Sequence, residues 1–289
     1  MQGRVARALE AFRMKICRGG FETRPYGADF EVYTMAEVLR AEGLSKHFGG
    51  LVAVNRVSFQ IQPNESVGII GPNGSGKTTF FNLLTGSFPP TQGRIHFFGK
   101  DITGLAPNRR VLQGMVRTFQ LVSVFNSMPV WENLVLSTLR FHQESLSEWN
   151  FLFSPANRES IRKSCYEAMK EVGLEKNWQT MTSELSYGSK RMLEIGIALS
   201  LKPKLLLLDE PLSGLSDLEI VEVLDILQRI KKHLTLIIIE HKLSKIVNLV
   251  ERLCVMNEGS FICEGAPDQV LSDRAVRECY WGKGEMSLS

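Results

Sequence analysis

Cysteine is scarce in this chain, its net charge is small, and it contains no long hydrophobic run. The 289 residues include five cysteines, which never stand in C-x-x-C spacing. We therefore expect neither a zinc site nor a disulfide framework, and we predict reduced thiols, as in a cytosolic protein. The formal net charge is only +3, which gives no reason to expect nucleic acid as a partner. The longest apolar runs, 205–208 and 234–239, fall far short of the about 18 residues of a membrane-spanning helix and fit buried strands.

Residues 1–36 differ in character from the rest of the chain. They are rich in arginine and lysine, and glycines and Pro25 interrupt any regular pattern. They also lack the apolar centre of a secretory signal. We predict a mobile extension; the alternative is a basic amphipathic helix that binds a membrane or a partner.

The strongest signal in the sequence is a phosphate-binding loop, residues 71–79 (GPNGSGKTT), hereafter the phosphate loop. It matches G-x-x-x-x-G-K-[ST] between an apolar strand at 67–70 and an apolar helix from residue 80. Glycines let such a loop wrap closely around phosphate oxygens, and the helix N-terminus adds partial positive charge. Lys77 supplies a full charge for the β- and γ-phosphates, and the Thr78 hydroxyl can bind Mg²⁺. The chain is therefore predicted to bind a nucleoside triphosphate.

An aromatic residue precedes this loop. Residues 39–42 and 57–61 alternate like antiparallel strands, and Phe48 lies in the turn-rich segment between them. Its ring could stack on adenine; stacking on a base contributes roughly 1–3 kcal/mol in proteins that bind single-stranded nucleic acids. The alternative is that Phe48 belongs to the core.

Polar side chains follow three further predicted strands. Asp209 and Glu210 end one apolar run, where Asp209 can hold Mg²⁺ and Glu210 can accept the proton of a water that attacks the γ-phosphorus. His241 ends the last such run and could hydrogen-bond the γ-phosphate. Gln120 follows another strand, and its side-chain oxygen can reach a metal ion or the attacking water.

A helical region is predicted from about residue 121 to 185, and a second helix start follows it. Residues 185–188 (LSYG), hereafter the signature, precede an apolar helical face. Ser186 has the character of an N-cap and Gly188 leaves the backbone open, so this helix start could hold an anion. The alternative is an ordinary capped helix.

In this order the motifs resemble those of the ATP-binding subunit of ABC transporters, over about residues 37–282. The resemblance is carried by the phosphate loop, Gln120, residues 185–189, Asp209-Glu210, the turn 213–217 and His241. Finer similarity to importers of branched-chain and other hydrophobic amino acids is carried by residues 47–55, 101–105, 117–120, 185–188 and 278–282. Residues 193–196 are also similar to the related importers of urea and short amides.

The resemblance implies an α/β fold, namely a P-loop NTPase (RecA-like) core with an N-terminal antiparallel β subdomain and an inserted α-helical subdomain. The ATPase domain would span 37–270, the helical subdomain about 121–185, and a C-terminal tail 271–289. Two such subunits would face each other, each ATP lying between the phosphate loop of one subunit and the signature of the other.

The same resemblance assigns roles to individual residues. The catalytic residues would be Lys77, Gln120, Glu210 and His241, and Mg²⁺ would be held by Thr78, Gln120 and Asp209, partly through water. The ATP-binding residues would be Phe48, Val54, Gly71, Asn73, Gly74, Ser75, Gly76, Lys77, Thr78 and Thr79. The signature contributed to the partner would be Leu185, Ser186, Tyr187 and Gly188, and the cross-subunit turn would be Ser213, Gly214, Leu215, Ser216 and Asp217.

The implied partners are a second ATP-binding subunit, identical or paralogous, two transmembrane permease subunits and an extracytoplasmic solute-binding protein, with no nucleic acid. The chain would lie peripherally on the cytoplasmic face of the cell membrane. Its helical subdomain, with Trp131 and Glu132 near the start, would dock the permease loops. Three residues depart from the family pattern: Ser189 replaces Gln or Glu, Ser216 replaces a frequent Asp, and Asn64 replaces a frequent Gly.

Two rival functions remain beside an importer of amino acids or of urea and short amides. A soluble ATPase of this class that acts in translation or DNA repair usually has two cassettes, a long coiled coil or zinc inserts, and none is found in this sequence. A non-hydrolysing regulatory module would not need Glu210 and His241.

Overall fold

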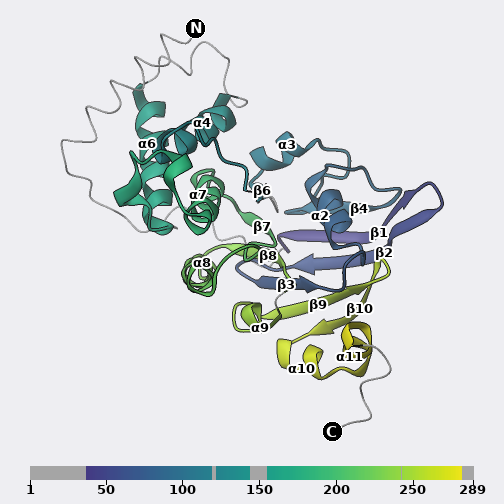
Figure 1. Cartoon of the computed structure of the whole chain (residues 1–289). Coiled ribbons are helices and arrows are strands. Elements are labelled where there is room, and N and C mark those ends of the chain that lie inside the picture. The colour runs from purple at the N-terminus through teal and green to yellow at the C-terminus, as the bar shows by residue number, and fades with distance from the viewer. Residues whose placement is uncertain (1–36, 119–121, 144–154, 242, 282–289) are drawn as a thin grey trace. The chain divides into compact units, whose positions relative to one another are not determined.

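The computed structural model describes residues 37–118, 122–143, 155–241 and 243–281. The predicted extension 1–36, the predicted metal ligand Gln120 and the last residues of the tail, 282–289, lie outside these ranges. The predicted α/β fold is confirmed, because the strands form one antiparallel sheet and one largely parallel sheet that are accompanied by helices (Figure 1).

The antiparallel sheet has four strands in the order β2-β1-β4-β5. Leu39 of β1 pairs with Ile61 of β2 on one side and with Phe97 of β4 on the other. The two segments that alternate in the sequence are antiparallel strands, as predicted, and they pair with each other. The strands span Leu39–Phe48 (β1), Leu51–Ile61 (β2), Gln92–Phe97 (β4) and Lys100–Asp101 (β5).

The second sheet has six strands in the order β10-β9-β3-β8-β7-β6, and only β10 runs antiparallel to its neighbour. Every residue of β3, β7 and β8 is buried, which explains why their sequences are mainly apolar. The carboxyl ends of these parallel strands meet at one edge of the sheet, where α/β proteins bind ligands. The strands span Ser66–Ile70 (β3), Met115–Arg117 (β6), Leu205–Asp209 (β7), Thr235–Ile239 (β8), Arg252–Asn257 (β9) and Ser260–Gly265 (β10).

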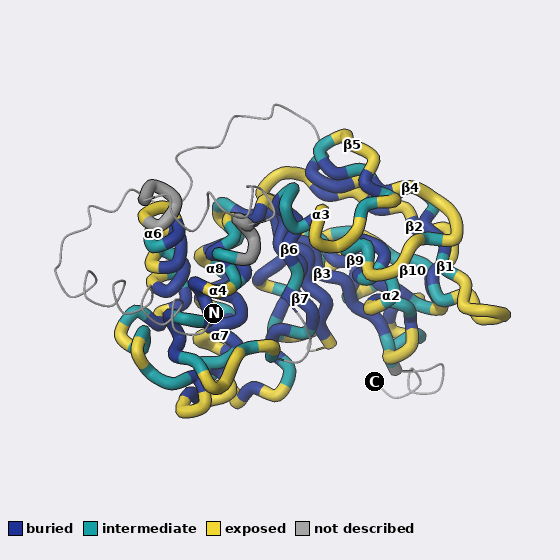
Figure 2. Tube along the Cα trace, turned by 90° about the horizontal axis from the view of Figure 1, so that it is seen from above, coloured by how far each residue is buried: buried dark blue, intermediate teal, exposed yellow. Residues whose placement is uncertain are grey.

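The core joins both sheets through the helix that follows the phosphate loop. Phe59 of β2, Phe80 of this helix and Phe261 of β10 contact one another, with ring centroids 5.5 to 6.1 Å apart. The strands β3 and β7 of the parallel sheet are buried throughout (Figure 2). The guanidinium of the buried Arg110 donates to the last carbonyls of that helix, where a cation complements the helix dipole. The helices of this part are Lys77–Thr85 (α2), Pro107–Leu112 (α3), Asp217–Ile230 (α8), Leu243–Ile246 (α9), Pro267–Ser272 (α10) and Arg274–Trp281 (α11).

Two helices fall inside the predicted helical region, and both pack against the helix that follows it. The two helices inside the region are Val130–Gln143 (α4) and Pro155–Glu171 (α6), and the helix that follows is Tyr187–Ser200 (α7). Short 3₁₀ turns lie at Glu175–Asn177 and Thr182–Glu184. Ile161, Cys165 and Met169, which are spaced by four residues, are buried. Among the described helices, none combines the length and the apolar character needed to cross a membrane.

Asn64, one of the three departures from the family pattern, lies at a backbone position that favours glycine. The residue has a φ of 59°, and its N–H donates to the Thr235 hydroxyl at 2.9 Å. Asparagine adopts this left-handed region more readily than most residues do, so the position accepts asparagine where glycine is frequent.

Candidate active site

The phosphate loop is held by backbone groups from two other segments. A Cβ at Gly71 would lie 2.1 Å from the carbonyl oxygen of Met256, and one at Gly76 would lie 2.4 Å from that of Ala53. Side chains are therefore impossible at both positions without moving β9 or β2. A Cβ at Gly74, by contrast, would meet nothing within 4 Å, so the middle of the loop faces open space in which phosphate oxygens can approach the backbone.

The turn between β9 and β10 completes this junction. The Gly259 N–H donates to the Ser75 carbonyl at 2.9 Å, and the Gly259 carbonyl accepts from the Asn55 N–H at 2.8 Å. The loop is thus fixed to a segment almost 200 residues further along the chain. Glu258 and Gly259 were not predicted at the site, because only the fold brings this turn to the loop.

Lys77 lies folded into the loop that carries it. Its ammonium group donates to the carbonyls of Gly71 and Pro72, at 2.8 and 2.9 Å. Burial lowers the pKa of Lys77, while the nearby Glu210 and Asp209 carboxylates act in the opposite direction. The loop therefore keeps a positive charge close to its backbone N–H groups, where a phosphate can exchange for the carbonyl contacts.

A cavity of about 640 Å³ opens over the loop, which is within the usual size of a small-molecule site. It is lined by Phe48, Leu51, Val52, Ala53, Asn73, Gly74, Gly76, Lys77, Thr78, Thr79, Glu210, His241, Glu258 and Gly259. Most of the predicted ATP-binding and catalytic residues thus share one cavity. Gly71 and Ser75 are buried rather than among the lining residues, and Val54 is completely buried in the core, whereas Val52 and Ala53 face the cavity.

Phe48 is 43% exposed, so it is not a core residue. Its ring lies edge-on against Phe88, with centroids 5.6 Å apart, and the Lys46 ammonium is 5.2 Å from the Phe48 ring and 5.8 Å from the Phe88 ring. Lys46 is fixed in turn by donating to the Pro89 carbonyl at 2.8 Å. These contacts hold the Phe48 ring at the cavity wall in an orientation set by its neighbours.

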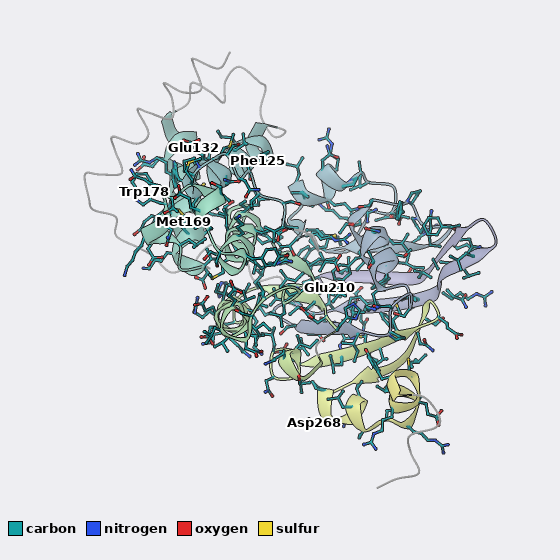
Figure 3. All side chains as sticks on the ribbon, viewed as in Figure 1. Phe125, Glu132, Met169, Trp178, Glu210 and Asp268 are labelled. Carbon is teal, nitrogen blue, oxygen red and sulfur yellow. The ribbon has the colours of Figure 1, made fainter. Side chains whose placement is uncertain are left out.

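Glu210 and His241 meet at the carboxyl ends of the adjacent strands β7 and β8. The His241 Nε2 atom lies 2.7 Å from Glu210 Oε1, and Glu210 has a φ of 49° just after the end of β7 (Figure 3). The buried Glu240 carboxylate accepts hydrogen bonds from the N–H groups of Leu212 and His241, at 2.7 and 3.1 Å. Backbone contacts therefore fix the segments that carry both predicted catalytic side chains.

Asp209 is buried beside the cavity and forms an ion pair that the sequence did not reveal. Its Oδ2 atom lies 2.5 Å from Nη2 of Arg117, whose Nη1 donates to the Asn82 side chain at 2.7 Å. Arg117 reaches Asp209 because β6 and β7 are neighbours. The carboxylate of Asp209 and the hydroxyl of Thr78 are hard oxygen donors of the kind that Mg²⁺ prefers. In the described part of the chain, no group of three or more His, Cys, Asp or Glu side chains is gathered for a metal, so a bound Mg²⁺ would depend on phosphate and water oxygens as well.

The signature lies away from this cavity and next to the cross-subunit turn, residues 213–217. Ser186 is the N-cap of α7 and accepts a hydrogen bond from the Ser189 N–H at 3.1 Å. A Cβ at Gly214 would lie 3.1 Å from the Tyr187 ring, so the two predicted partner-facing motifs are neighbours. Neither contributes a residue to the cavity wall. The structure thus separates the predicted site residues into two groups, one that lines the cavity and one that does not.

One side chain that contacts this second group was not predicted. Glu219 accepts hydrogen bonds from Gly188 and Ser186 of the signature, and its backbone and side chain form a capping box with Ser216. The S-x-x-E pattern at 216–219 is visible in the sequence and would have placed a helix start there. It would not have revealed the contact with the signature.

Comparison with known proteins agrees with this geometry. The sequence profile of ABC transporters matches residues 54–213. The high-affinity branched-chain amino acid transport ATP-binding proteins BraF of Pseudomonas aeruginosa and LivG of Escherichia coli K12 are 34% and 35% identical over 251 residues, which cover 85% of this chain and 98% of each relative. A probable LivG of Methanocaldococcus jannaschii is 34% identical over 253 residues, 86% of this chain and 98% of the relative.

Solved structures give the same result. A nucleotide-free ATP-binding cassette from an ABC transporter superposes with a TM-score of 0.74 at 32% identity, covering 86% of this chain and all of that one. The ADP conformation of an ABC transporter cassette gives the same values. The chain therefore belongs to the ABC transporter family and is an ATP-binding, transport-coupled ATPase of that family.

Proposed function

We propose that this ATPase drives import of branched-chain or other hydrophobic amino acids through separate membrane subunits. The observation that carries this proposal is the similarity to BraF and LivG, which extends over 98% of their length at 34 to 35% identity. The proposed partners are two permease subunits, a second ATP-binding subunit, identical or paralogous, and an extracytoplasmic solute-binding protein. The proposed location is the cytoplasmic face of the membrane.

The cavity supports hydrolysis by in-line attack of water on the γ-phosphorus. Lys77 binds the β- and γ-phosphates, and Phe48 stacks on the adenine. Glu210 accepts the proton of the attacking water, and His241, 2.7 Å away, orients the carboxylate and contacts the γ-phosphate. Thr78 and Asp209, with Gln120 from outside the described residues, would hold Mg²⁺, which when bound neutralises charge on the phosphates.

The signature completes the site of the other subunit. Ser186 and Gly188 offer a hydroxyl and a backbone N–H at the N-terminus of α7, a place that favours anions. These donors are supported as ligands of the partner's nucleotide because they do not line the cavity of their own subunit. Closure of two subunits would surround each ATP and exclude water from it, which strengthens stabilisation of the transition state.

A second cavity, of about 260 Å³, is where we place the permease contact. Its walls come mainly from α3, β6 and α7 and are mostly apolar, and they include Thr118 and Ser123, which stand on either side of residues 119–121 in the sequence. A permease segment bound here would reach both the helical part and the strand that precedes Gln120. Trp131, which was expected to take part in docking, is only 5% exposed and belongs to the core, whereas Glu132 is half-buried.

Uptake measurements test the transported substrate. Cells that lack this chain would be supplied with the wild-type protein or with Lys77→Ala, and uptake of radiolabelled leucine, isoleucine and valine would be compared with uptake of urea. We expect the wild-type chain alone to restore uptake of the amino acids. Restoration of urea uptake instead would favour the short-amide importer. Cell fractionation tests the other rival: recovery of the chain with ribosomes or DNA rather than membranes would favour a soluble ATPase.

A further inference from the structure

A carboxylate of the same subunit occupies the hydrogen-bond donors of the signature. Oε1 of Glu219 accepts from the Gly188 N–H at 2.9 Å and from the Ser186 hydroxyl at 3.1 Å. Oε2 accepts from the N–H and the hydroxyl of Ser216, at 3.0 and 2.8 Å. One side chain from the first turn of α8 thus bridges the signature and the cross-subunit turn.

The contact is close, and the carboxylate is held in its charged form. A Cβ at Gly188 would lie 2.6 Å from Glu219 Oε1, so glycine is what lets the carboxylate approach the backbone. Hydrogen bonds from the Ser216 backbone, from the Ser216 hydroxyl and from the Gly188 backbone lower the pKa of Glu219 to about 2. At neutral pH the signature therefore holds a negative charge that belongs to its own chain.

The donors that Glu219 uses are those that the proposed function assigns to the partner's nucleotide. The Ser186 hydroxyl has one hydrogen to donate, and the Gly188 N–H has one as well. Neither can bond the carboxylate and a γ-phosphate fully at the same time, and two anions at one helix terminus repel each other. Resting on that proposed function, we propose that Glu219 is an internal competitor of the partner's γ-phosphate, which must displace this carboxylate before two subunits close.

Displacement does not require the helix to unfold. Ser216 is the N-cap of α8 and bonds the Glu219 carboxylate in a capping box, so a combined change of the side-chain torsions can move Oε1 away from the signature while the carboxylate stays near Ser216. A lone subunit then has a satisfied signature, and only a partner that carries a triphosphate offers an anion of higher charge to replace it. Association of the subunits thereby depends on ATP, and Glu219 sets how much ATP is needed.

The variant Glu219→Gln tests this with a small change. Glutamine also closes a capping box, so α8 should keep its start, while the negative charge is lost. The protein carrying Glu210→Gln, in which bound ATP persists, is titrated with ATP, and dimer formation is followed by analytical ultracentrifugation. Adding Glu219→Gln should lower the ATP concentration at half-maximal dimer about tenfold, the size of one charge-assisted hydrogen bond.

Glu222→Gln is the matched control, because Glu222 lies on α8 as well and is exposed. It should leave the ATP requirement unchanged, and an equal decrease in this variant would assign the effect to charge in general and overturn the proposal. Glu219→Asp keeps the charge but shortens the reach to Gly188, so it should lower the ATP requirement too.

Two further outcomes separate this inference from the function on which it rests. If both Glu219 variants are folded, by thermal unfolding, and need as much ATP as their parent or more, Glu219 is no competitor, while the shared site stands. If the Glu210→Gln protein does not dimerise at any ATP concentration, the shared site is wrong, and this inference fails with it.

Discussion

The phosphate loop and the signature both lead into a helix, yet their surroundings differ: the loop lines a cavity, and the signature is bonded to a carboxylate of its own subunit. The phosphate loop lines an open cavity and carries the cation of Lys77, whose contacts are to carbonyls of the loop itself. Donors of the signature are already bonded to the carboxylate of Glu219. In the proposed function, the difference means that one subunit is ready to bind a triphosphate at its loop, whereas its signature must first lose the contact with Glu219 before it can bind the partner's triphosphate.

The two regions also differ in what holds them. The phosphate loop is pinned between the backbones of β2 and β9 and by the turn at Gly259. The signature contacts its own helix, Glu219 and the adjacent turn. A rigid half that binds nucleotide and a half that is held by a few exchangeable hydrogen bonds fit a cycle in which subunits associate and separate.

The largest effect is expected at Glu210, the predicted base for the water that attacks the γ-phosphorus. Glu210→Gln should keep ATP binding and lower turnover by about 10²- to 10⁴-fold, because the attacking water loses its base. The variant should also accumulate as an ATP-bound dimer. ATP hydrolysis by the assembled transporter and size-exclusion chromatography would measure this, and turnover at the normal rate would contradict the role of Glu210.

The next effect concerns the rigidity of the phosphate-binding half. Arg117→Met should lower the free energy of unfolding by about 3–5 kcal/mol, because it leaves the Asp209 carboxylate buried without its cation. Chemical denaturation would measure the change. The double variant Arg117→Met/Asp209→Asn should recover most of the loss, and Ser189→Ala near the signature should cost less than about 0.5 kcal/mol. An equal loss of unfolding free energy in Arg117→Met and Ser189→Ala would show that the phosphate-binding region is no more rigid than the signature.

Lys77→Ala should weaken ATP binding to a lone subunit about a hundredfold, which corresponds to about 3 kcal/mol of charge-assisted contacts with phosphate. Binding of a fluorescent ATP analogue would report it. Lys190→Ala, which removes a lysine beside the signature, should leave this affinity unchanged. ATP affinity that is the same in Lys77→Ala and in the wild-type protein would show that the cation is not part of the loop's function.

The smallest effect concerns the aromatic side of the cavity. Phe88→Ala removes the ring that fixes Phe48 and should weaken ATP binding by about 1 kcal/mol or less, the usual scale of an aromatic pair. Binding of inorganic tripolyphosphate, which has no base, should not change. Phe125→Ala, in the helical part and 53% exposed, is the control. Equal losses for ATP and tripolyphosphate would show that Phe88 acts on the loop and not on base binding.

The sequence predicted features that depend on local patterns. The phosphate loop, the buried strands and the N-cap at Ser186 all depend on residues within a few positions of one another, and the structure contains each of them. That Glu210 and His241 lie at the same edge of the sheet was also predictable, because parallel strands end at one edge, whereas their direct contact depends on β7 and β8 being neighbours.

Features that depend on the order of strands or on loop packing were not predictable. Arg117 meets Asp209 across 92 residues, and Glu219 meets Gly188 across 31. Neither contact leaves a pattern in the sequence. Val54 was assigned to the nucleotide by resemblance, but it is buried in the core. Val52, on the same strand, lines the cavity. Only packing distinguishes the two valines.

Mixing two inactive variants tests the division of the site most directly. One protein would carry Lys77→Ala, which disables its phosphate loop, and the other Ser186→Phe, which blocks its signature. In a mixed pair, one intact loop faces one intact signature, so we predict that ATP drives mixed dimers and restores part of the hydrolysis, while each variant alone remains monomeric and inactive. A mixture as inactive as its components would contradict a nucleotide shared between subunits.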